Sequence, residues 1–388
     1  MEAKCQSKTI CYSAIFKNES KNVYRCLDAL KPLIDFVSIC DTGSTDNTVE
    51  LIKKWGKENS IPTKVHYGEE QVFKNFGYNR TLAYKKSIED FPNADYLLLV
   101  DADMVVKINS GFKKNSLDLD SYLFEQVTPG IRYWNVRLIS AKCEWECVGV
   151  THEYWETKKQ NSVTGKLLDI WIDDIGDGGS KEDKFKRDIR LLLEGINNSN
   201  TSDHLKGRYM FYLANSYKDS GQPEEAVKWY QSRIDAGGWV EEIFYSYLSK
   251  GRCYEKMKDH PNAVYTFLQA YEHRPSRAES LYELSKLFRG MGKNNAALIY
   301  SLQGQSIEYP TQDSLFIEHN VYNYLFLEEI SICGFYCGTK NKEKGKACVI
   351  KLLSMKDKIS ESSYKLALSN AKYYGLSEDI IDKFKAAD

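Results

Sequence analysis

The sequence lacks the features that would mark a membrane, secreted or nucleic-acid-binding protein. Lys and Arg number 53 against 54 Asp and Glu, and this net charge of −1 favours no anionic partner. No apolar run reaches the roughly 20 residues of a membrane-spanning helix. The N-terminal residues are too polar for a signal peptide. We therefore expect a globular protein with no transmembrane segment and no nucleic-acid partner.

Cysteine is present but without any metal-binding spacing. The 10 Cys are scattered, and none forms a Cys-x-x-Cys pair or lies near a His partner, so the pattern does not support a zinc site. Buried, reduced thiols in a reducing compartment are the simpler interpretation. Asn18-Glu-Ser and Asn79-Arg-Thr would also be glycosylation sequons among the candidate site residues described below. Both observations predict a cytoplasmic location.

The N-terminal part alternates between strand and helix patterns, which predicts a parallel sheet with helices on both faces. After about residue 104 the pattern changes to antiparallel strands. The expected strands are 9–16, 36–40, 64–67, 96–100, 120–127, 131–140, 145–150 and 167–172; the expected helices are 20–34, 46–59 and 77–90. Ser20 is the predicted N-cap of the first helix, and residues 157–166 are a predicted mobile loop.

From about residue 205 the sequence is helical throughout. Three segments share small and aromatic residues at similar spacing, and their alanines Ala226, Ala263 and Ala296 recur at intervals close to the 34 residues of a tetratricopeptide repeat. Residues 341–388 are predicted to end the stack as capping helices. We therefore predict two domains, 1–204 and 205–388.

The most informative motif is Asp101-Ala-Asp103, which follows the apolar run 96–100. Such a run is typical of a buried strand, and residues i and i+2 of a strand project to the same side. Both carboxylates should therefore leave the carboxyl end of a strand together, where open α/β sheets bind ligands. Two oxygen donors there suit Mg²⁺ or Mn²⁺ holding a diphosphate.

Further signals accompany this motif in a fixed order along the chain. They are Lys17-Asn-Glu19, Asp41-Thr-Gly-Ser-Thr-Asp-Asn-Thr48, Gly77-Tyr-Asn-Arg80, His152-Glu153 and the loop Gly178-Gly179. This order resembles glycosyltransferase family 2, in the branch that carries tetratricopeptide-like helices after its catalytic domain. The resemblance implies an α/β GT-A fold, a Rossmann-like mixed sheet that binds nucleotide-diphosphosugars, followed by an all-α repeat domain.

The resemblance implies that several of these residues contact the nucleotide. Asn18 and Glu19 stand where the family places nucleotide contacts, and Asp41 is expected to accept a hydrogen bond from the base or ribose. Asn79 and Arg80 match the family's Asn-Arg pair, and Arg80 is expected to pair with a phosphate or with Asp101. The chain departs from the family at Tyr78, where an Arg is usual. Asp46 is more simply explained as a helix cap or first-turn carboxylate.

The same resemblance implies a metal and a base. Asp103 is the expected direct metal ligand, Asp101 the expected ribose or metal-water contact, and His152 a further ligand. Glu153 is the expected general base that deprotonates the acceptor hydroxyl. The open alternative is that Glu153 is a structural carboxylate paired with a Lys or Arg.

An acidic, glycine-rich turn follows and offers competing groups. Asp173, Asp174 and Asp177 are alternative bases or metal ligands, in a region where many relatives carry a His. Lys181, with Lys184 and Arg187, is expected either to cover the diphosphate or to lie on a solvated helix face.

We therefore expect an inverting hexosyltransferase that uses Mn²⁺ or Mg²⁺ and a nucleotide-sugar donor, with a UDP-sugar as the expected donor. The acceptor would be a hydroxyl of a protein, peptide or glycan, and the helical domain could mediate homo-oligomers. One alternative is an inactive tetratricopeptide scaffold that binds nucleotide or protein partners. Another is a sugar-phosphate nucleotidyltransferase, but 15–19 lacks the Gly-rich basic loop that such an enzyme needs.

Overall fold

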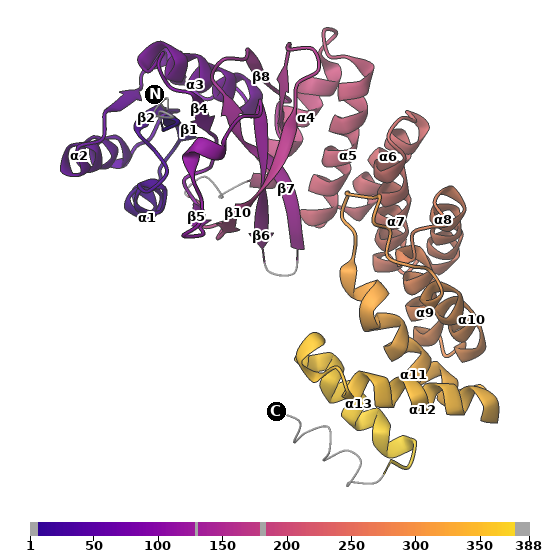
Figure 1. Ribbon diagram of the computed structural model, residues 1–388. Coiled ribbons are helices and arrows are strands. Elements are labelled where there is room, and N and C mark those ends of the chain that lie inside the picture. Colours follow the sequence, from indigo (N-terminus) through magenta and orange to yellow (C-terminus); the bar gives the residue numbers. More distant parts are fainter. Residues whose placement is uncertain (1–6, 129–130, 179–183, 377–388) are drawn as a thin grey trace. The chain divides into compact units, whose positions relative to one another are not determined.

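The computed structural model describes residues 7–128, 131–178 and 184–376. The chain divides into two compact units, Met1–Thr201 and Ser202–Asp388, and each is described by itself (Figure 1). The notebook-style expectations for residues 180, 181 and 183 fall outside the described residues.

The first unit is built on a mixed eight-stranded sheet in the order β3-β2-β1-β4-β7-β6-β10-β5. β1 pairs in parallel with β2 and β4, whereas β7 is antiparallel to β4 and β6. The strands are β1 Ile10–Phe16, β2 Phe36–Asp41, β3 Thr63–His66, β4 Tyr96–Leu98, β5 Met104–Ile108, β6 Ser121–Thr128, β7 Ile131–Ser140 and β10 Thr164–Asp174; β8 Trp145–Val148 and β9 Tyr154–Thr157 form a separate hairpin.

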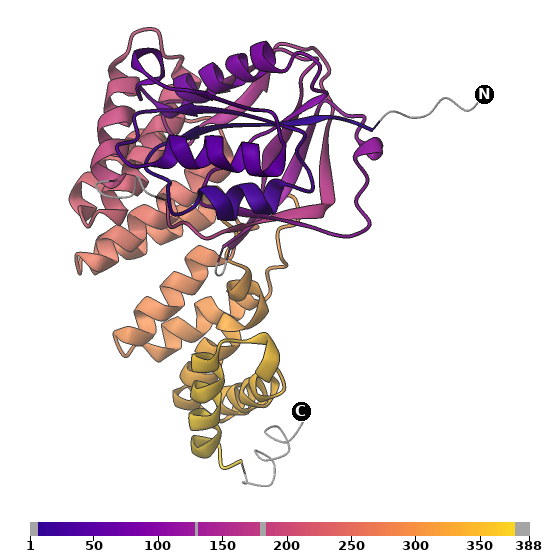
Figure 2. The same ribbon diagram turned by 90° about the vertical axis from the view of Figure 1, so that its left-hand side faces the viewer.

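Helices cover both faces of this sheet, as Figure 2 shows. They are α1 Val23–Leu30, α2 Thr48–Asn59, α3 Phe76–Asp90 and α4 Lys184–Asn197, with short 3₁₀ turns η1 Glu69–Gln71 and η2 Lys114–Ser116. Alternate residues of β1 point to opposite faces. Tyr12 packs with α1 in the main core, whereas the hydroxyl of Ser13 meets that of Ser87 on α3 at 2.8 Å.

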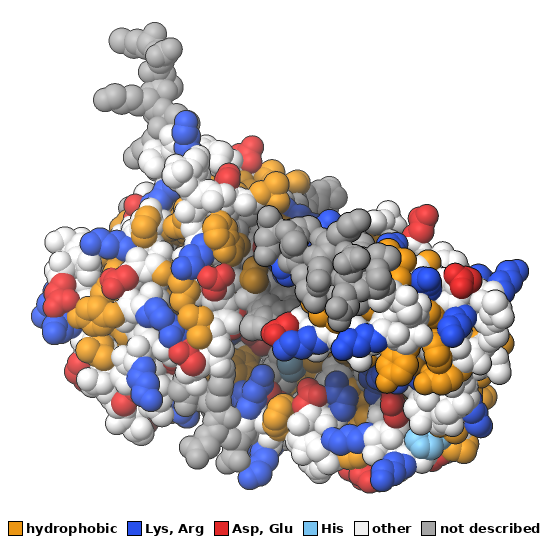
Figure 3. Space-filling view, turned by 90° about the horizontal axis from the view of Figure 1, so that it is seen from below, with side chains coloured by type: hydrophobic (Ala, Val, Ile, Leu, Met, Phe, Trp, Pro, Cys, Tyr) orange, Lys and Arg blue, Asp and Glu red, His pale blue; other side chains and the backbone are white. Residues whose placement is uncertain are grey.

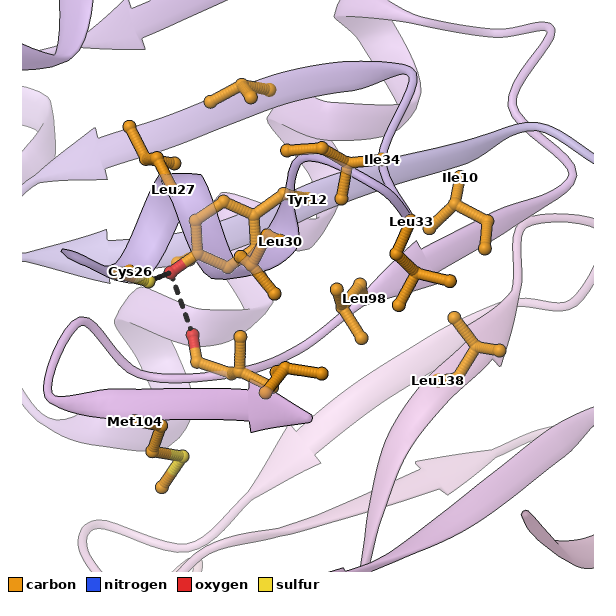
Figure 4. Packing of buried hydrophobic residues seen from close by; sticks show 14 of the residues in the cluster. Ile10, Tyr12, Cys26, Leu27, Leu30, Leu33, Ile34, Leu98, Met104 and Leu138 are labelled. Atoms are coloured by element: carbon orange, nitrogen blue, oxygen red, sulfur yellow. Dashed lines mark hydrogen bonds between the residues drawn. The ribbon is translucent and has the colours of Figure 1, made fainter. Parts of the chain in front are cut away.

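Tyr12 also fixes the strand end that carries the aspartates (Figure 4). Its hydroxyl donates to the Val100 carbonyl at 3.1 Å and lies 3.5 Å from the Cys26 sulfur on α1. The Tyr12 side chain is fully buried. A buried hydroxyl needs such partners, so this contact ties α1 to the residue that precedes Asp101.

The predicted order of strands and helices is confirmed, with differences at three places. α1 begins at Val23 rather than Ser20, because the Ser20 amide donates instead to Asp46 and the structural N-cap is Asn22. The short strands β5 and β9 were not predicted. β10 already begins at Thr164, within the segment predicted as a loop, because it pairs there with β6.

The second unit is all-helical, and consecutive helices pack against each other. Its helices are α5 Asp203–Asp219, α6 Pro223–Asp235, α7 Val240–Lys256, α8 His260–His273, α9 Glu279–Gly290, α10 Asn294–Gln305, α11 Phe326–Tyr336, α12 Thr339–Leu353 and α13 Glu361–Tyr373, with the π-helical turn η3 Val321–Leu325 and the 3₁₀ turn η4 Lys356–Lys358. The predicted helical repeats are therefore present.

The repeat is more exact than its predicted form. Ala226 and Ala263 are fully buried, but the third buried alanine is Ala297 and not the predicted Ala296. Each is followed four positions later by a fully buried side chain, Tyr230, Phe267 or Ser301. A β-carbon on Gly251 of α7 would lie 2.5 Å from the Phe267 ring. Small residues thus let paired helices approach where the larger side chain inserts.

Three surface and composition findings complete the description. Acidic and basic side chains are interspersed on the face shown in Figure 3. Within the described ranges, no helix has both the length and the apolar character needed to cross a membrane. The nine cysteines in these ranges are all free thiols, and only Cys337 is not buried.

Candidate active site

The candidate site lies where β1, β2 and β4 end. Phe16, the last residue of β1, is in register with Asp41 at the end of β2, and both strands run in parallel. Asn18 and Glu19 follow β1, and Asp101 and Asp103 follow β4 closely. Because carboxyl ends of parallel strands meet at one edge, these polar residues gather there, where α/β sheets bind ligands.

Asp41 organises the loop after β2. Its Oδ1 accepts from the amides of Gly43 at 3.1 Å and Ser44 at 2.8 Å, and the Ser44 hydroxyl donates to Oδ2 at 2.5 Å. Gly43 has φ +107°, a conformation that favours glycine. The Asn18 amide donates to the Ser44 hydroxyl at 2.8 Å, and Asn18 Oδ1 accepts from the Thr45 amide at 2.8 Å. Asp41 therefore shapes both loops, and its contact with a nucleotide stays a prediction.

Asp46 has the structural role that its position suggested. Its carboxylate accepts from the amide and hydroxyl of Thr48, at 3.1 and 2.5 Å, and from the Ser20 amide at 3.2 Å. Burial raises the pKa of Asp46, but these hydrogen bonds outweigh it and the pKa is lowered overall. Asp46 therefore joins the start of α2 to the loop after β1.

Arg80, on α3, is the hub of the charged network. Its Nη2 lies 2.7 Å from Asp101 Oδ1 and its Nε lies 2.6 Å from Glu153 Oε1. Burial raises the pKa of Asp101, but Arg80 and Arg137 outweigh it and hold the pKa below its usual value. Of the two predicted partners of Arg80, the structure thus shows Asp101. It also shows Glu153 paired with an arginine, which was the structural alternative for that residue.

We expect Arg80→Met to lower the free energy of unfolding by about 3 kcal/mol, because it leaves two carboxylates without their buried cation. Urea unfolding at pH 7 measures this. Lys54→Met is the matched control, since Lys54 forms an exposed pair with Glu58 and should change stability by at most about 1 kcal/mol.

The pH dependence of this effect has a definite sign. Because the folded-state pKa of Asp101 is lowered, its stabilising effect is complete above its ordinary value of about 3.9 and is lost as the pH falls further. The difference between the wild type and Arg80→Met should therefore shrink below about pH 4. A difference that is constant with pH, or no greater than that of Lys54→Met, would contradict the role of this ion pair.

Asp103 and Glu19 converge on Gly178. The Gly178 amide donates to Asp103 Oδ2 at 3.3 Å. A β-carbon built on Gly178 would lie 3.0 Å from that oxygen and 3.1 Å from Glu19 Oε1. The other Glu19 oxygen accepts from the Asn22 side chain at 2.8 Å. Glycine at this position therefore allows the loop after β10 to lie directly against two carboxylates from two different strand ends.

The acidic residues near the end of β10 do not form one cluster. Asp177 makes a two-pronged ion pair with Arg25 of α1, at 2.6 and 2.7 Å. Asp173 and Asp174 belong to the strand itself, where successive side chains point to opposite faces. Asp173 lies 3.9 Å from the Lys107 ammonium, and Asp174 accepts from Gln126 at 2.8 Å. Lys181 lies outside the described residues.

His152 is exposed and has a left-handed φ of +51° in the turn between β8 and β9. Among the described residues, no three His, Cys, Asp or Glu side chains are grouped so that they could hold a metal ion. The predicted ligands Asp101, Asp103 and His152 are therefore not assembled around one point, and Asp101 is held by Arg80 instead.

Asn79 is 1% exposed and bonds within its own region of the chain. Its Oδ1 accepts from the Lys74 amide at 2.9 Å, and its Nδ2 donates to the carbonyls of Gln71 and Val72 at 3.2 and 3.3 Å. Asn79 thus shapes the turn before α3, and its predicted nucleotide contact remains untested.

Two charged residues that the sequence analysis missed lie close to the site. Arg137 on β7 donates to the Leu99 carbonyl at 3.2 Å and to Gln126 at 2.8 Å. Asp188 on α4 is 2% exposed; burial raises its pKa, although Arg187 lies 3.1 Å away and opposes this shift. A charged residue on the buried side of an alternating strand or amphipathic helix is the signal that could have identified both.

Comparison with known proteins identifies the first unit. Residues 14–110 match the family model described as "Glycosyl transferase family 2". This segment contains β1 to β5 and includes Asn18, Asp41, Arg80, Asp101 and Asp103. No curated protein matches the chain.

Solved structures with weak similarity include several tetratricopeptide-type proteins. A structure titled "Crystal structure of MamA" is 16% identical, with 53% of this chain and 98% of that chain covered and a TM-score of 0.33. BtubC (BKLC) from P. vanneervenii is 11% identical, with coverages of 52% and 90% and a TM-score of 0.38. TPR-like repeats of a Podosopora anserina putative kinesin light chain are 18% identical, with coverages of 46% and 89% and a TM-score of 0.35. At TM-scores below 0.5 these likenesses carry no functional argument.

Proposed function

Because its first unit contains a glycosyl transferase family 2 domain, we propose that the chain is an inverting, metal-dependent glycosyltransferase with a nucleotide-diphosphosugar donor. The family supports glycosyl transfer from a nucleotide sugar in general; a UDP-sugar is the specific donor proposed here. The observation that carries the proposal is the gathering of Asp41, the Arg80–Asp101–Glu153 network and Asp103 at the strand ends of the matched domain.

The nucleotide would lie against the loops after β1 and β2. Asp41 accepts three hydrogen bonds from its own loop, and a carboxylate offers about four acceptor positions. One position remains for a uracil N–H or a ribose hydroxyl. Asn18 would support this contact indirectly, because its bonds to Ser44 and Thr45 hold the same loop in place.

We expect Asp41→Ala to weaken UDP binding by about 1–3 kcal/mol, the range for hydrogen bonds to a charged group. Isothermal titration with UDP alone measures this without sugar or acceptor. Ser44→Ala is the matched control, since it removes one loop hydrogen bond but keeps the carboxylate. Unchanged affinity in Asp41→Ala would place the nucleotide elsewhere. Equal losses in both variants would show that Asp41 acts only by supporting its loop.

The donor set near Gly178 fits a hard divalent cation. Mg²⁺ and Mn²⁺ prefer carboxylate oxygens, and Mg²⁺ usually combines one or two of them with water and phosphate oxygens. Asp103 would hold the ion, with Glu19 close enough to contribute, as their shared distance to Gly178 indicates. His152 and Asp101 stay predicted ligands. When bound, the ion would supply Lewis-acid stabilisation to the departing diphosphate.

Glu153 is the proposed general base. The acceptor oxygen would form its bond to the anomeric carbon while the bond from that carbon to the diphosphate oxygen breaks, and Glu153 would take the hydroxyl proton. The Arg80 guanidinium at 2.6 Å holds the carboxylate in one orientation. Asp177 is the competing base, but its two oxygens are engaged by Arg25.

One observation favours the alternative of an inactive scaffold that binds nucleotide or protein. Asp101 and Glu153 are both paired with Arg80, so a scaffold could use all three residues only for stability. A screen of nucleotide sugars for donor hydrolysis with Mn²⁺ separates the two functions. Hydrolysis of at least one donor supports the transferase, whereas UDP binding without hydrolysis or transfer of any donor supports the scaffold.

The acceptor and the cellular setting are further parts of the proposal. A protein, peptide or glycan hydroxyl is the proposed acceptor, and the helical unit is the proposed platform for partners or for a second copy of the chain. Cytoplasmic location also stays a prediction, which the free buried thiols of the described residues support.

A further inference from the structure

The long connection between α10 and α11 lies on the first helices of the repeat pairs, in orange beside α7 in Figure 1. The first helices α5, α7 and α9 are themselves neighbours in the second unit. We call residues 313–318, Asp-Ser-Leu-Phe-Ile-Glu, the strap. The residues that hold it come from α5, α7, α9 and the α8–α9 connection, and we call them the strap face: Phe211, Glu241, Tyr245, Arg252, Arg274, Arg277 and Glu279.

Ion pairs hold both ends of the strap. The Arg274 guanidinium binds the Asp313 carboxylate through two nitrogens, and Arg277 adds a third contact at 3.3 Å. Hydrogen bonding from Arg274 lowers the pKa of Asp313. At the other end, Arg252 lies 2.6 Å from Glu318. The strap face thus recognises one acidic side chain at each end of a six-residue segment.

Side chains of the strap face also bind the strap's backbone. One Glu241 oxygen accepts from the amides of Ser314 and Leu315 at 2.8 and 2.7 Å. Arg277 donates to the carbonyls of Leu315 and Phe316, both at 3.3 Å. Side chains that bind the N–H and C=O groups of an extended segment can hold it without regular secondary structure. The strap is therefore held as a separate peptide would be.

An aromatic contact lies between the two ion pairs. The Phe316 ring is 4.9 Å from that of Tyr245 and 6.3 Å from that of Phe211, with which it is stacked. Phe316 nevertheless stays 39% exposed and has a left-handed φ of +46°. A phenylalanine normally occupies this region only where surrounding contacts compensate its strain. The central anchor of the strap is thus its least buried and most strained residue.

We propose that the strap is an intramolecular ligand that closes the strap face, and that a partner peptide of the same chemistry displaces it. Such a peptide is extended, with an acidic residue, an aromatic residue three positions later and a second acidic residue two positions after that. The strap's high local concentration lets it exclude a weak partner, so only a well-matched or multivalent peptide would enter. This inference is independent of sugar transfer by the first unit.

The test is binding of a fluorescein-labelled synthetic peptide with the sequence of residues 310–320, followed by anisotropy with the full chain. We expect the strap variant Phe316→Ala/Glu318→Gln to bind it at least about tenfold more tightly than the wild type, because the competing ligand is weakened. Gln312→Ala, an exposed change just before the strap, is the matched control and should bind like the wild type. Adding Arg274→Gln to the strap variant, or replacing Phe by Ala in the peptide, should remove the binding.

Two results would overturn the proposal: equal affinity for the wild type and the strap variant, or no binding by a strap variant that still unfolds cooperatively. If the double variant does not fold, Phe316→Ala alone takes its place, since this partly exposed ring leaves little cavity. Hydrogen exchange at the Ser314 and Leu315 amides gives a second readout. Exchange should quicken in the wild type at saturating peptide, and unchanged exchange with bound peptide would show a different binding site.

Discussion

Asp103→Asn is expected to lower sugar transfer at saturating donor by at least about 100-fold, since a Lewis-acid ion supplies several kcal/mol and 1.36 kcal/mol is a factor of ten. The amide keeps the shape of the side chain but loses the negative charge that would hold the cation. Gly178 lies against this carboxylate, so a larger replacement would also disturb the loop after β10. Transfer rates across a series of Mn²⁺ concentrations measure the effect.

The matched control for this variant is Asp169→Asn. Asp169 is an exposed residue of β10, away from the strand-end carboxylates, and its replacement should leave transfer unchanged. Thermal unfolding of both variants checks that the fold is intact. Near-normal transfer by Asp103→Asn at low Mn²⁺ would rule out Asp103 as the metal ligand, and Glu19→Gln would then be the next variant to test.

Glu153→Gln is expected to reduce transfer to the acceptor by roughly 10²–10⁴-fold while UDP-sugar binding is kept, the range for a general base. Glutamine retains an oxygen that can accept from Arg80 Nε, so the ion-pair geometry is disturbed little. It cannot take a proton at neutral pH. Rates with saturating donor and varied acceptor, together with donor affinity by titration, separate the chemical step from binding.

Two other acids serve as comparisons in the same assay. Asp177→Asn breaks the ion pair with Arg25 on the protein surface, whereas Asp188→Asn changes a buried acid of α4. If only Asp177→Asn is inactive, the base lies in the loop after β10. If Asp188→Asn is inactive with normal donor binding and Glu153→Gln is active, the buried acid takes the proton and Glu153 is structural.

Local sequence patterns were sufficient to predict most of the first unit and the position of its candidate site. The apolar run before Asp101 predicted a buried strand, and β4 begins at the predicted Tyr96. The strand before Asp41 was predicted in the same way. Such runs are informative because burial on both faces of a parallel strand requires consecutive apolar residues. Short strands such as β9 lack this signal, because they are partly exposed and depend on one hairpin partner.

Side-chain partners were less predictable where several were chemically equivalent. Ser20 has the chemistry of an N-cap, yet its amide bonds to Asp46, 26 positions later in the chain. Ala296 and Ala297 are adjacent and alike, and only packing against the neighbouring helix shows that Ala297 is the buried one. A choice between equivalent residues depends on neighbours that are distant in sequence, which periodicity does not specify.

The sequence by itself thus determined the order of elements, the helical repeats and the strand ends that bear the carboxylates, because these depend on burial patterns within short segments. Only the tertiary structure decided that Arg80 bridges Asp101 and Glu153, that Asp103 and Glu19 meet at Gly178, and that the strap lies on α5, α7 and α9. Each of these contacts joins residues far apart in the chain. Charge and hydrogen bonding allow many such pairings, and the packing of the whole unit selects one of them.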